Sequence, residues 1–240
     1  MARNDLDDVP KRPRVTVNCD MGEAYGNWKM GPDEDLMPLI DIANVACGFH
    51  GGDPVVMHNT IKLAKKHGVL VGAHPSLPDR EGFGRRYIDI SPEHLYDQLV
   101  YQIGALTGML RAEDMPLNHI KTHGYLWRLC EGSEAHCKAV LDAIELFGVP
   151  MLVIAGTRME TMAKVRGMPY VPEFYPDIHY NEDGSLMSIL RDGRVALADI
   201  EPKVEKVIRE DIVVSKSGKA AKMNLEDREF SCCVHSDLQQ

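Results

Sequence analysis

Short apolar runs alternate along the chain with longer segments that carry apolar residues on one face. Several short runs are almost continuously apolar, which is typical of strands covered on both faces of a parallel sheet. Repeated alternation of strand and helix predicts an α/β fold. Because seven such runs occur with no switch in the pattern, we expect a closed TIM-like (β/α)7 barrel rather than a doubly wound sheet. The predicted strands span residues 15–20, 44–49, 70–74, 119–123, 151–155, 170–175 and 231–235.

Helix-start signals stand where this alternation requires helices. Asp53 and Ser91 each precede a proline, and an N-cap residue followed by proline marks the first turn of a helix. Ser133 opens a third helix, and Thr157 with Glu160 forms a capping box for a fourth. Each signal follows a predicted strand, which supports the strand–helix order.

The two ends of the chain depart from this regular order. Residues 1–14 are charged and contain prolines, so we expect a flexible leader before a single barrel domain over residues 15–240. The pattern predicts a helix over residues 201–209 and a hairpin over residues 211–223 before the last strand. No helix pattern follows that strand, although a barrel normally carries one there. Such an absence would expose apolar surface, which favours a homo-oligomer or a docked partner.

Composition narrows the functional class. The net charge of −9 argues against nonspecific binding to nucleic acid, and no apolar stretch reaches the roughly 20 residues of a membrane span. The first residues lack the apolar core of a signal peptide. The six cysteines lack the C-x2-C spacing of a zinc knuckle, and we expect them to be reduced thiols. The sequence therefore predicts a cytoplasmic protein with neither a membrane nor a nucleic acid as partner.

Ionisable side chains gather just past the ends of five predicted strands. The carboxyl ends of parallel strands meet at one face of a barrel, and that face holds the active sites of such folds. One cleft would therefore receive carboxylates, imidazoles and a lysine from separate strands. We expect these residues to be catalytic: Asp20, His50, His74, Lys121 and His123.

This set suits two chemistries. Asp20, His50, His74 and His123 can hold a divalent metal with an open position for water. The same groups can instead act without metal, with Asp20 or a histidine as general base toward water. Lys121 can neutralise an oxyanion or a substrate carboxylate. Burying an unpaired ammonium within a strand is costly, which argues against a merely structural lysine.

A second set of residues is expected to bind substrate around the first. Two members have plain structural alternatives, since Glu23 can be a solvated loop carboxylate and Asp53 already serves as an N-cap. Glycines beside His50 would let the backbone approach a ligand closely. Neither a G-x4-G-K-[ST] phosphate loop nor a GxGxxG fingerprint occurs. The expected substrate-binding residues are Glu23, Asn44, Gly48, Asp53, Arg85, His235 and Asp237.

Read in order, these residues lie in segments that resemble the LamB/YcsF family. The segments are VNCDMGEAYG, ANVACGFHGGDP, VGAHPSLPDREGFGRR, YQIGAL, HIKTHGYLW, YNEDGSL and CCVHSD. The resemblance covers nearly the whole chain and implies a barrel of the glycoside hydrolase/deacetylase type. It also implies the A-type subunit of an ATP-dependent 5-oxoprolinase, which opens 5-oxoproline or a related small lactam. ATP with Mg2+ would then be handled through B- and C-type partner subunits, in agreement with the missing phosphate loop.

Two other functions stay open at this point. The barrel and its Asp/His cluster also resemble metal-dependent deacetylases. The third alternative is a catalytically inactive binding or regulatory subunit, because Ile178 stands where the family pattern carries a positive charge. The presence of all the expected catalytic residues argues against this third alternative.

Overall fold

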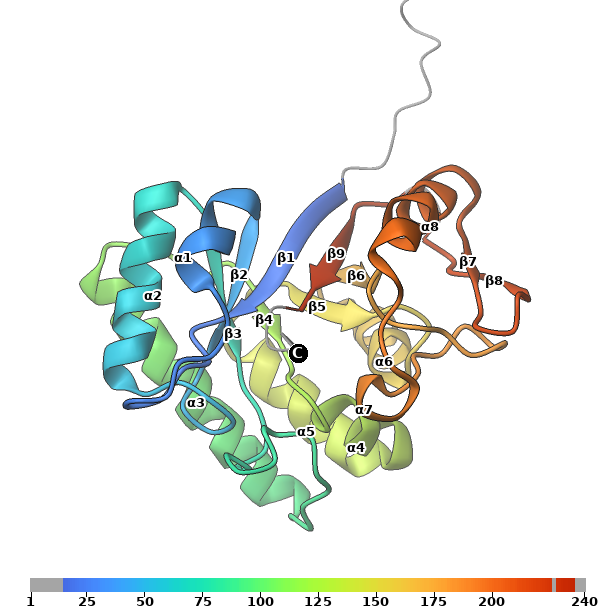
Figure 1. Cartoon of the computed structure of the whole chain (residues 1–240). Helices are drawn as coiled ribbons and strands as arrows, with labels where there is room; N and C mark the ends of the chain where they lie inside the picture. Colours follow the sequence, from blue (N-terminus) through green and yellow to red (C-terminus); the bar gives the residue numbers. More distant parts are fainter. Residues whose placement is uncertain (1–14, 226–227, 236–240) are drawn as a thin grey trace, which may run out of the picture.

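Seven parallel strands close into a barrel at the centre of the molecule (Figure 1). This computed structural model of the 240-residue chain describes residues 15–225 and 228–235. The strands neighbour one another in the order β1-β2-β3-β4-β5-β6-β9, so the expected seven-stranded α/β barrel is confirmed. The strands are β1 Val15–Met21, β2 Ile42–Ala46, β3 Leu70–His74, β4 Ile120–Lys121, β5 Met151–Ile154, β6 Tyr170–Phe174 and β9 Phe230–Val234.

The barrel closes because its last strand pairs in parallel with both β1 and β6. Val15 of β1 faces Phe230 of β9, and Glu173 of β6 faces Ser231 of β9. The strand ends differ most from expectation at β2, which stops at Ala46. The turn after β2 is therefore longer than the sequence pattern predicts, and it carries His50.

The helices flank the barrel and connect its strands (Figure 1). The four predicted N-caps are confirmed, because the side chains of Asp53, Ser91, Ser133 and Thr157 each accept a backbone hydrogen bond from the first turn. Sequence periodicity missed α1, α4 and α7, which are too short to show a stripe. The helices are α1 Asp33–Leu36, the 3-10 helix η1 Met37–Leu39, α2 Pro54–His67, α3 Pro92–Ala112, α4 Leu126–Gly132, α5 Glu134–Glu145, α6 Arg158–Arg166, α7 Ile189–Asp192 and α8 Leu197–Glu210.

A small addition between α7 and β9 packs on one side of the barrel. Its helix α8 begins before the expected start at residue 201. Strand β7 (Ile212–Val214) pairs antiparallel with β8 (Ala220–Lys222), which confirms the expected hairpin. Figure 1 shows this hairpin next to α8, on the opposite side of the barrel from α2.

Two apolar clusters hold these parts together. The larger cluster joins the first five strands to α2, α3 and α5, with Ile61 and Leu99 fully buried in it. The smaller cluster joins β6 and β9 to α8 and the hairpin through Phe174, Val207 and Val213. Since each such side chain contributes about 1.5–3 kcal/mol when fully buried, the smaller cluster anchors the addition to the barrel.

The six cysteines are buried free thiols, as expected. No helix among residues 15–225 and 228–235 is long and apolar enough to cross a membrane. The expected leader over residues 1–14, the substrate-binding role of Asp237 and the lack of a helix after β9 all fall outside the described residues.

Candidate functional site

A polar network fills the inside of the barrel. Side chains alternate along a strand, so Thr16, Asn18 and Asp20 of β1 share the inner face, and all three are buried. Asn44 of β2 donates through Nδ2 to Oδ1 of Asn18 at 2.8 Å and to Oδ1 of Asp20 at 2.9 Å. Thr16 donates to Oγ of Ser231 at 3.0 Å. These bonds satisfy buried polar groups and fix Asp20 at the carboxyl end of β1.

Lys121 is the buried cation of this network. Its Nζ lies 2.9 Å from Oδ1 of Asp20 and 2.9 Å from Sγ of Cys233. Oε1 of Glu173 lies 3.3 Å from the same Nζ. Burial disfavours the ammonium, but Asp20 raises the pKa of Lys121 well above its usual value. Burial also disfavours the carboxylate, yet His74 and Lys121 hold the pKa of Asp20 well below its usual range, so the pair stays ionised.

His119 lies in the barrel core beside Asn44, at a position where the sequence pattern predicts only the start of a strand. Oδ1 of Asn44 accepts a hydrogen bond from Nε2 of His119 at 2.7 Å. The ring packs on Gly72 of β3, where an added Cβ would lie 2.2 Å from Cε1. Burial lowers the pKa of His119 to about 3, so the ring is neutral. Gly72 could have indicated this contact in the sequence, because a glycine inside a strand often marks a place where another group approaches the backbone closely.

Two histidines at neighbouring strand ends point a nitrogen at each other. Nε2 of His74 lies 3.0 Å from Nδ1 of His123. Nδ1 of His74 donates to the carbonyl of Lys121 at 2.8 Å, and Nε2 of His123 donates to the carbonyl of Phe83 at 2.8 Å. Because a carbonyl only accepts, these bonds fix the outer nitrogens as donors. When both rings are neutral, the facing nitrogens are two lone pairs, which require a proton or a cation between them.

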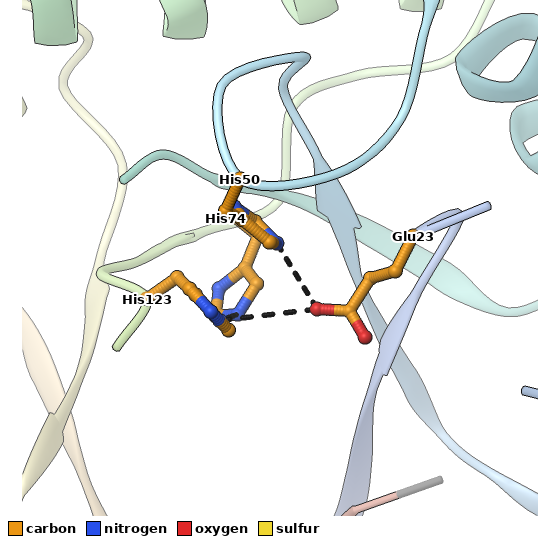
Figure 2. Close-up of side chains that lie close together, drawn as sticks. All are labelled: Glu23, His50, His74 and His123. Carbon is orange, nitrogen blue, oxygen red and sulfur yellow. Dashed lines mark hydrogen bonds and ion pairs between the residues drawn. The ribbon is translucent and has the colours of Figure 1, made fainter. Parts of the chain in front are cut away.

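Glu23 and His50 approach the same point from other loops (Figure 2). Oε1 of Glu23 lies 3.0 Å from Nε2 of His50 and 3.8 Å from Nδ1 of His123. The rings of His50 and His123 stack with 3.7 Å between their centroids. Glu23 is only 5% exposed, so it is not a solvated loop carboxylate. Burial, followed by the neighbouring imidazoles, lowers the pKa of His50 and of His123 well below the usual value.

These side chains form a group that can hold a metal ion. One carboxylate oxygen and three imidazole nitrogens lie within 4.8 Å of one another, and all four side chains are buried. Imidazole nitrogens bind zinc at about 2.0–2.1 Å, so two nitrogens 3.0 Å apart can share an ion. We call this group the histidine cluster: Glu23, His50, His74 and His123.

The histidine cluster differs by one residue from the metal-binding set expected from the sequence. The expected set had Asp20 as its carboxylate, whereas the cluster has Glu23. Asp20 instead forms a second group with Cys233 and His235, and Oδ2 of Asp20 touches the cluster at 3.2 Å from Nε2 of His74. The loop after β1 therefore supplies the carboxylate that lies among the imidazoles.

A cleft of about 160 Å³ opens at the carboxyl ends of the strands. Three expected residues do not line this cleft but contact residues that do. His50 stacks on His123 and binds Glu23, and Asn44 is hydrogen-bonded to Asp20. Six of the expected site residues line the cleft: Asp20, His74, Arg85, Lys121, His123 and His235.

Gly48 and Asp53 do not line the cleft, and their hydrogen bonds hold the loop after β2 in place. Oδ1 of Asp53 accepts the first backbone N–H groups of α2, and Oδ2 accepts the N–H of Gly26 at 2.8 Å. The carbonyl of Gly48 accepts a hydrogen bond from Arg80. Both expected substrate-binding residues thus have structural roles in this arrangement.

A glycine-containing loop over residues 79–86 brings the carbonyl of Phe83, which accepts the hydrogen bond from His123, to the site. Asp79 accepts hydrogen bonds from the N–H of Gly82 and from Nε of Arg86, each at 2.9 Å, and so closes the loop over residues 79–86. Gly84 in this loop has a φ of +65°, and an added Cβ would lie 2.8 Å from Cδ2 of His123. Glycine at this position therefore lets the loop pack against the imidazole.

Three buried polar residues on and after β6 were not among the residues expected from the sequence: Glu173, Tyr175 and Asp177. The hydroxyl of Tyr175 donates to Oε2 of Glu173 at 3.0 Å. Oδ2 of Asp177 lies 3.0 Å from Nδ1 of His235. Glu173 and Asp177 could have been noticed as two carboxylates within an apolar run, because a buried carboxylate needs a partner.

Ile178, which stands where the family pattern carries a cation, is buried in the smaller apolar cluster and lines the cleft. Arg85 and Arg128 line other parts of the same cleft. The cleft therefore keeps guanidinium groups in its lining although residue 178 is apolar.

The chain resembles proteins of one family along nearly its whole length. The profile of the LamB/YcsF family matches residues 15–240. The lactam utilization protein lamB of Emericella nidulans is 44% identical over 230 residues, which cover 95% of this chain and 90% of that protein. The A-type subunit of 5-oxoprolinase from Staphylococcus aureus is 41% identical over 230 residues, with 93% and 90% covered. The crystal structure of the lactam utilization protein from Thermus thermophilus matches with a TM-score of 0.85 and 37% identity, covering 92% of this chain and 90% of that one. The chain belongs to the LamB/YcsF family.

Proposed function

We propose that this chain is the A-type subunit of an ATP-dependent 5-oxoprolinase and hydrolyses the amide bond of 5-oxoproline or a related small lactam. The names of two relatives, a lactam utilization protein and an A-type 5-oxoprolinase subunit, support this activity. The structural observation that best supports this activity is a row of contacting buried side chains in the cleft, Lys121, Asp20 and His74. Fixed charges of this kind accelerate amide hydrolysis most strongly in a site that excludes bulk solvent.

Asp20 is the group that accepts a proton from the attacking water. Its carboxylate lines the cleft, and Lys121 and His74 favour its ionised form. As the water oxygen bonds to the carbonyl carbon of the lactam, the water proton passes to Oδ2 or Oδ1 of Asp20. General-base assistance of this type contributes roughly 10²–10⁴-fold. Lys121, with Asp20, Cys233 and Glu173 around its Nζ, holds the base in position.

The histidine cluster fits a divalent metal ion. The facing nitrogens of His74 and His123 and the carboxylate of Glu23 are the ligands best placed to hold it. A metal bound there would polarise the lactam carbonyl or lower the pKa of a water molecule. The carbonyls of Lys121 and Phe83 orient the two imidazoles through their outer nitrogens, as partners of metal-binding histidines commonly do.

ATP with Mg2+ enters this proposal through B- and C-type partner subunits. A five-membered lactam is an unreactive amide, and phosphorylation of its oxygen makes the carbonyl carbon more reactive toward water. The phosphate leaves after the carbon–nitrogen bond has broken. The sequence carries no phosphate-binding loop of its own. We therefore assign ATP handling to the assembly, which we place in the cytoplasm.

The test is glutamate release from 5-oxoproline by the purified chain, with and without the partner subunits, ATP and Mg2+. We expect release only in the complete mixture. Asp20→Asn should lower the rate by at least about 100-fold, because a general base is lost. His67→Gln, at an exposed position of α2, is the matched control. Release without ATP, or an Asp20→Asn assembly as active as the wild type, would contradict the proposal.

The histidine cluster also supports a second candidate, a metal-dependent deacetylase. That enzyme would release acetate from an N-acetylated substrate with added Zn2+ and without ATP or partner subunits. Acetate release that disappears in His123→Ala would favour this candidate over lactam hydrolysis. A folded protein that forms neither glutamate nor acetate would favour the inactive binding or regulatory subunit.

A further inference from the structure

An aspartate–histidine pair lies on the wall of the cleft built by β6 and β9. Asp177 follows β6, and His235 follows β9. Oδ2 of Asp177 accepts hydrogen bonds from Nδ1 of His235 at 3.0 Å and from the backbone N–H of His235 at 3.2 Å. Asp177 is 4% exposed, and His235 lines the cleft. The backbone contact fixes the position of His235 beside Asp177, and the contact at Nδ1 fixes the tautomer of the ring.

The tautomer determines which ring nitrogen can act on a substrate. Nδ1 of His235 is the donor to Asp177, because an ionised carboxylate only accepts. Nε2 is therefore the nitrogen that can give a proton to a molecule in the cleft. The ring of Tyr175 stacks on that of His235 with 5.7 Å between centroids, which restricts rotation of the imidazole.

The charges around His235 favour its protonated form. Burial opposes the imidazolium, but the hydrogen bond and the charge of Asp177 raise the pKa of His235 above its usual value. Asp20 acts in the same direction and Lys121 in the opposite one. The charged and titratable groups that face His235 are Asp177, Asp20, Lys121, Tyr175, Cys233 and Arg194, whose guanidinium donates to the carbonyl of His235.

Asp20 and His235 both line the cleft, and their surroundings move their pKa values in opposite directions. Against the effect of burial, His74 and Lys121 lower the pKa of Asp20, whereas the hydrogen bond of Asp177 orients the ring of His235 and raises its pKa. Titratable groups whose surroundings push their pKa values apart divide acid and base roles between them. Asp20 can therefore act as the base and His235 as the acid in one hydrolytic reaction.

We propose that His235, positioned by Asp177, is the general acid that protonates the leaving nitrogen of the lactam. This role rests on the proposed lactam hydrolysis. The oxygen of water bonds to the carbonyl carbon, and its proton passes to Asp20. The bond between this carbon and the ring nitrogen breaks, and the nitrogen takes the proton from Nε2 of His235. The products are an amine and an acyl phosphate, because the former carbonyl oxygen carries the phosphoryl group from ATP. A second water releases inorganic phosphate and leaves a carboxyl group, and proton exchange with solvent restores Asp20 and His235.

The test uses the complete assembly with its partner subunits, ATP and Mg2+. His235→Gln should lower kcat by about 100-fold or more, with a smaller change in KM, because proton donation acts in the transition state. A general acid is active only while protonated, so the wild-type kcat should fall above the pKa of His235. This alkaline limb should disappear in His235→Gln. His67→Gln is again the matched control.

Asp177→Asn supplies a second measurement that does not remove the imidazole. Loss of the carboxylate lowers the pKa of His235, so the alkaline limb of kcat should move to lower pH. A rise in KM with kcat and the alkaline limb unchanged in His235→Gln would overturn the proposal and leave His235 as a substrate-binding residue. If the wild-type assembly opens no lactam, the proposed function fails and the role of His235 fails with it. Wild-type activity with an unaltered His235→Gln profile refutes only the general-acid role.

Discussion

Nζ of Lys121 lies 2.9 Å from Oδ1 of Asp20, with the two side chains only 4% and 8% exposed. An unpaired ion in such surroundings costs several kcal/mol, so each charge depends on the other. The same contact aims the Asp20 carboxylate into the cleft. The pair therefore links the stability of the barrel to the geometry of the base.

Lys121→Met should lower the free energy of unfolding by about 3–5 kcal/mol, because it leaves the buried Asp20 without its cation. The double variant Asp20→Asn/Lys121→Met should recover part of this loss, since neither charge of the pair is then present. Urea unfolding followed by circular dichroism measures both values. If the double variant is no more stable than Lys121→Met alone, the two charges are not coupled in this way.

His119 sets an acid limit to stability. Its pKa is about 3 in the folded protein, against about 6.5 in an unfolded chain. Between these values the unfolded chain binds a proton that the folded chain does not. Stability should therefore fall as the pH falls from about 6.5 toward about 3, by about 1.4 kcal/mol per pH unit for this one group.

His119→Gln removes this titration and can retain a hydrogen bond to Asn44. Its stability should depend less steeply on pH than that of the wild type between about pH 4 and pH 6. Unfolding by urea at several pH values gives the slopes, and His67→Gln, at an exposed position of α2, is the control substitution. Equal slopes in all three proteins would assign the acid sensitivity to other groups.

Much of the site was predictable because the fold itself gathers it. Asp20 lies one position before the end of β1, His74 ends β3, Lys121 ends β4, and His123 follows two positions later. In a parallel barrel these ends share one face, so identifying the strands was enough to place the residues together. His235 was expected among the substrate-binding residues for the same reason, since it directly follows β9.

The parts that sequence could not supply depend on loop paths and on closure of the barrel. Glu23 joins the imidazoles because the chain turns at Gly22, which has a φ of +67°, and strand periodicity does not describe such a turn. Asp177 meets His235 across 58 positions only because β9 inserts between β6 and β1. Neither relationship is visible from residue spacing alone.

Gly72→Ala should destabilise the protein by about 1–3 kcal/mol, because the new Cβ would overpack the barrel core. The Cβ would lie 2.2 Å from Cε1 of His119. The His119 ring is buried and has little room to move away. Gly108→Ala on α3 is the matched control, since its Cβ would meet no atom within 4 Å. That change should stabilise the helix by about 0.5–1 kcal/mol. Thermal unfolding decides the question, and a harmless Gly72→Ala would mean that His119 can be displaced.

Asp53→Ala should cost about 0.5–2 kcal/mol of stability, because α2 loses its N-cap. Asp53→Asn should cost less, since asparagine also caps helices well. We expect KM of the complete assembly to stay at the wild-type value in Asp53→Asn. A raised KM in this variant, with its unfolding temperature unchanged, would instead assign substrate binding to Asp53.

The histidine cluster predicts a stoichiometric divalent metal in the purified chain. His123→Ala and Glu23→Gln should each weaken metal binding by at least about 10-fold, because each removes a ligand atom. Elemental analysis after dialysis measures the content, and Zn2+ present at about 100 times its Kd should stabilise the metal-free wild type by about 2.7 kcal/mol. His58→Ala is the control, since His58 pairs with Glu113 away from the cluster. If the wild type neither retains metal nor is stabilised by it, the histidine cluster is not a metal site, and the facing nitrogens of His74 and His123 share a proton instead.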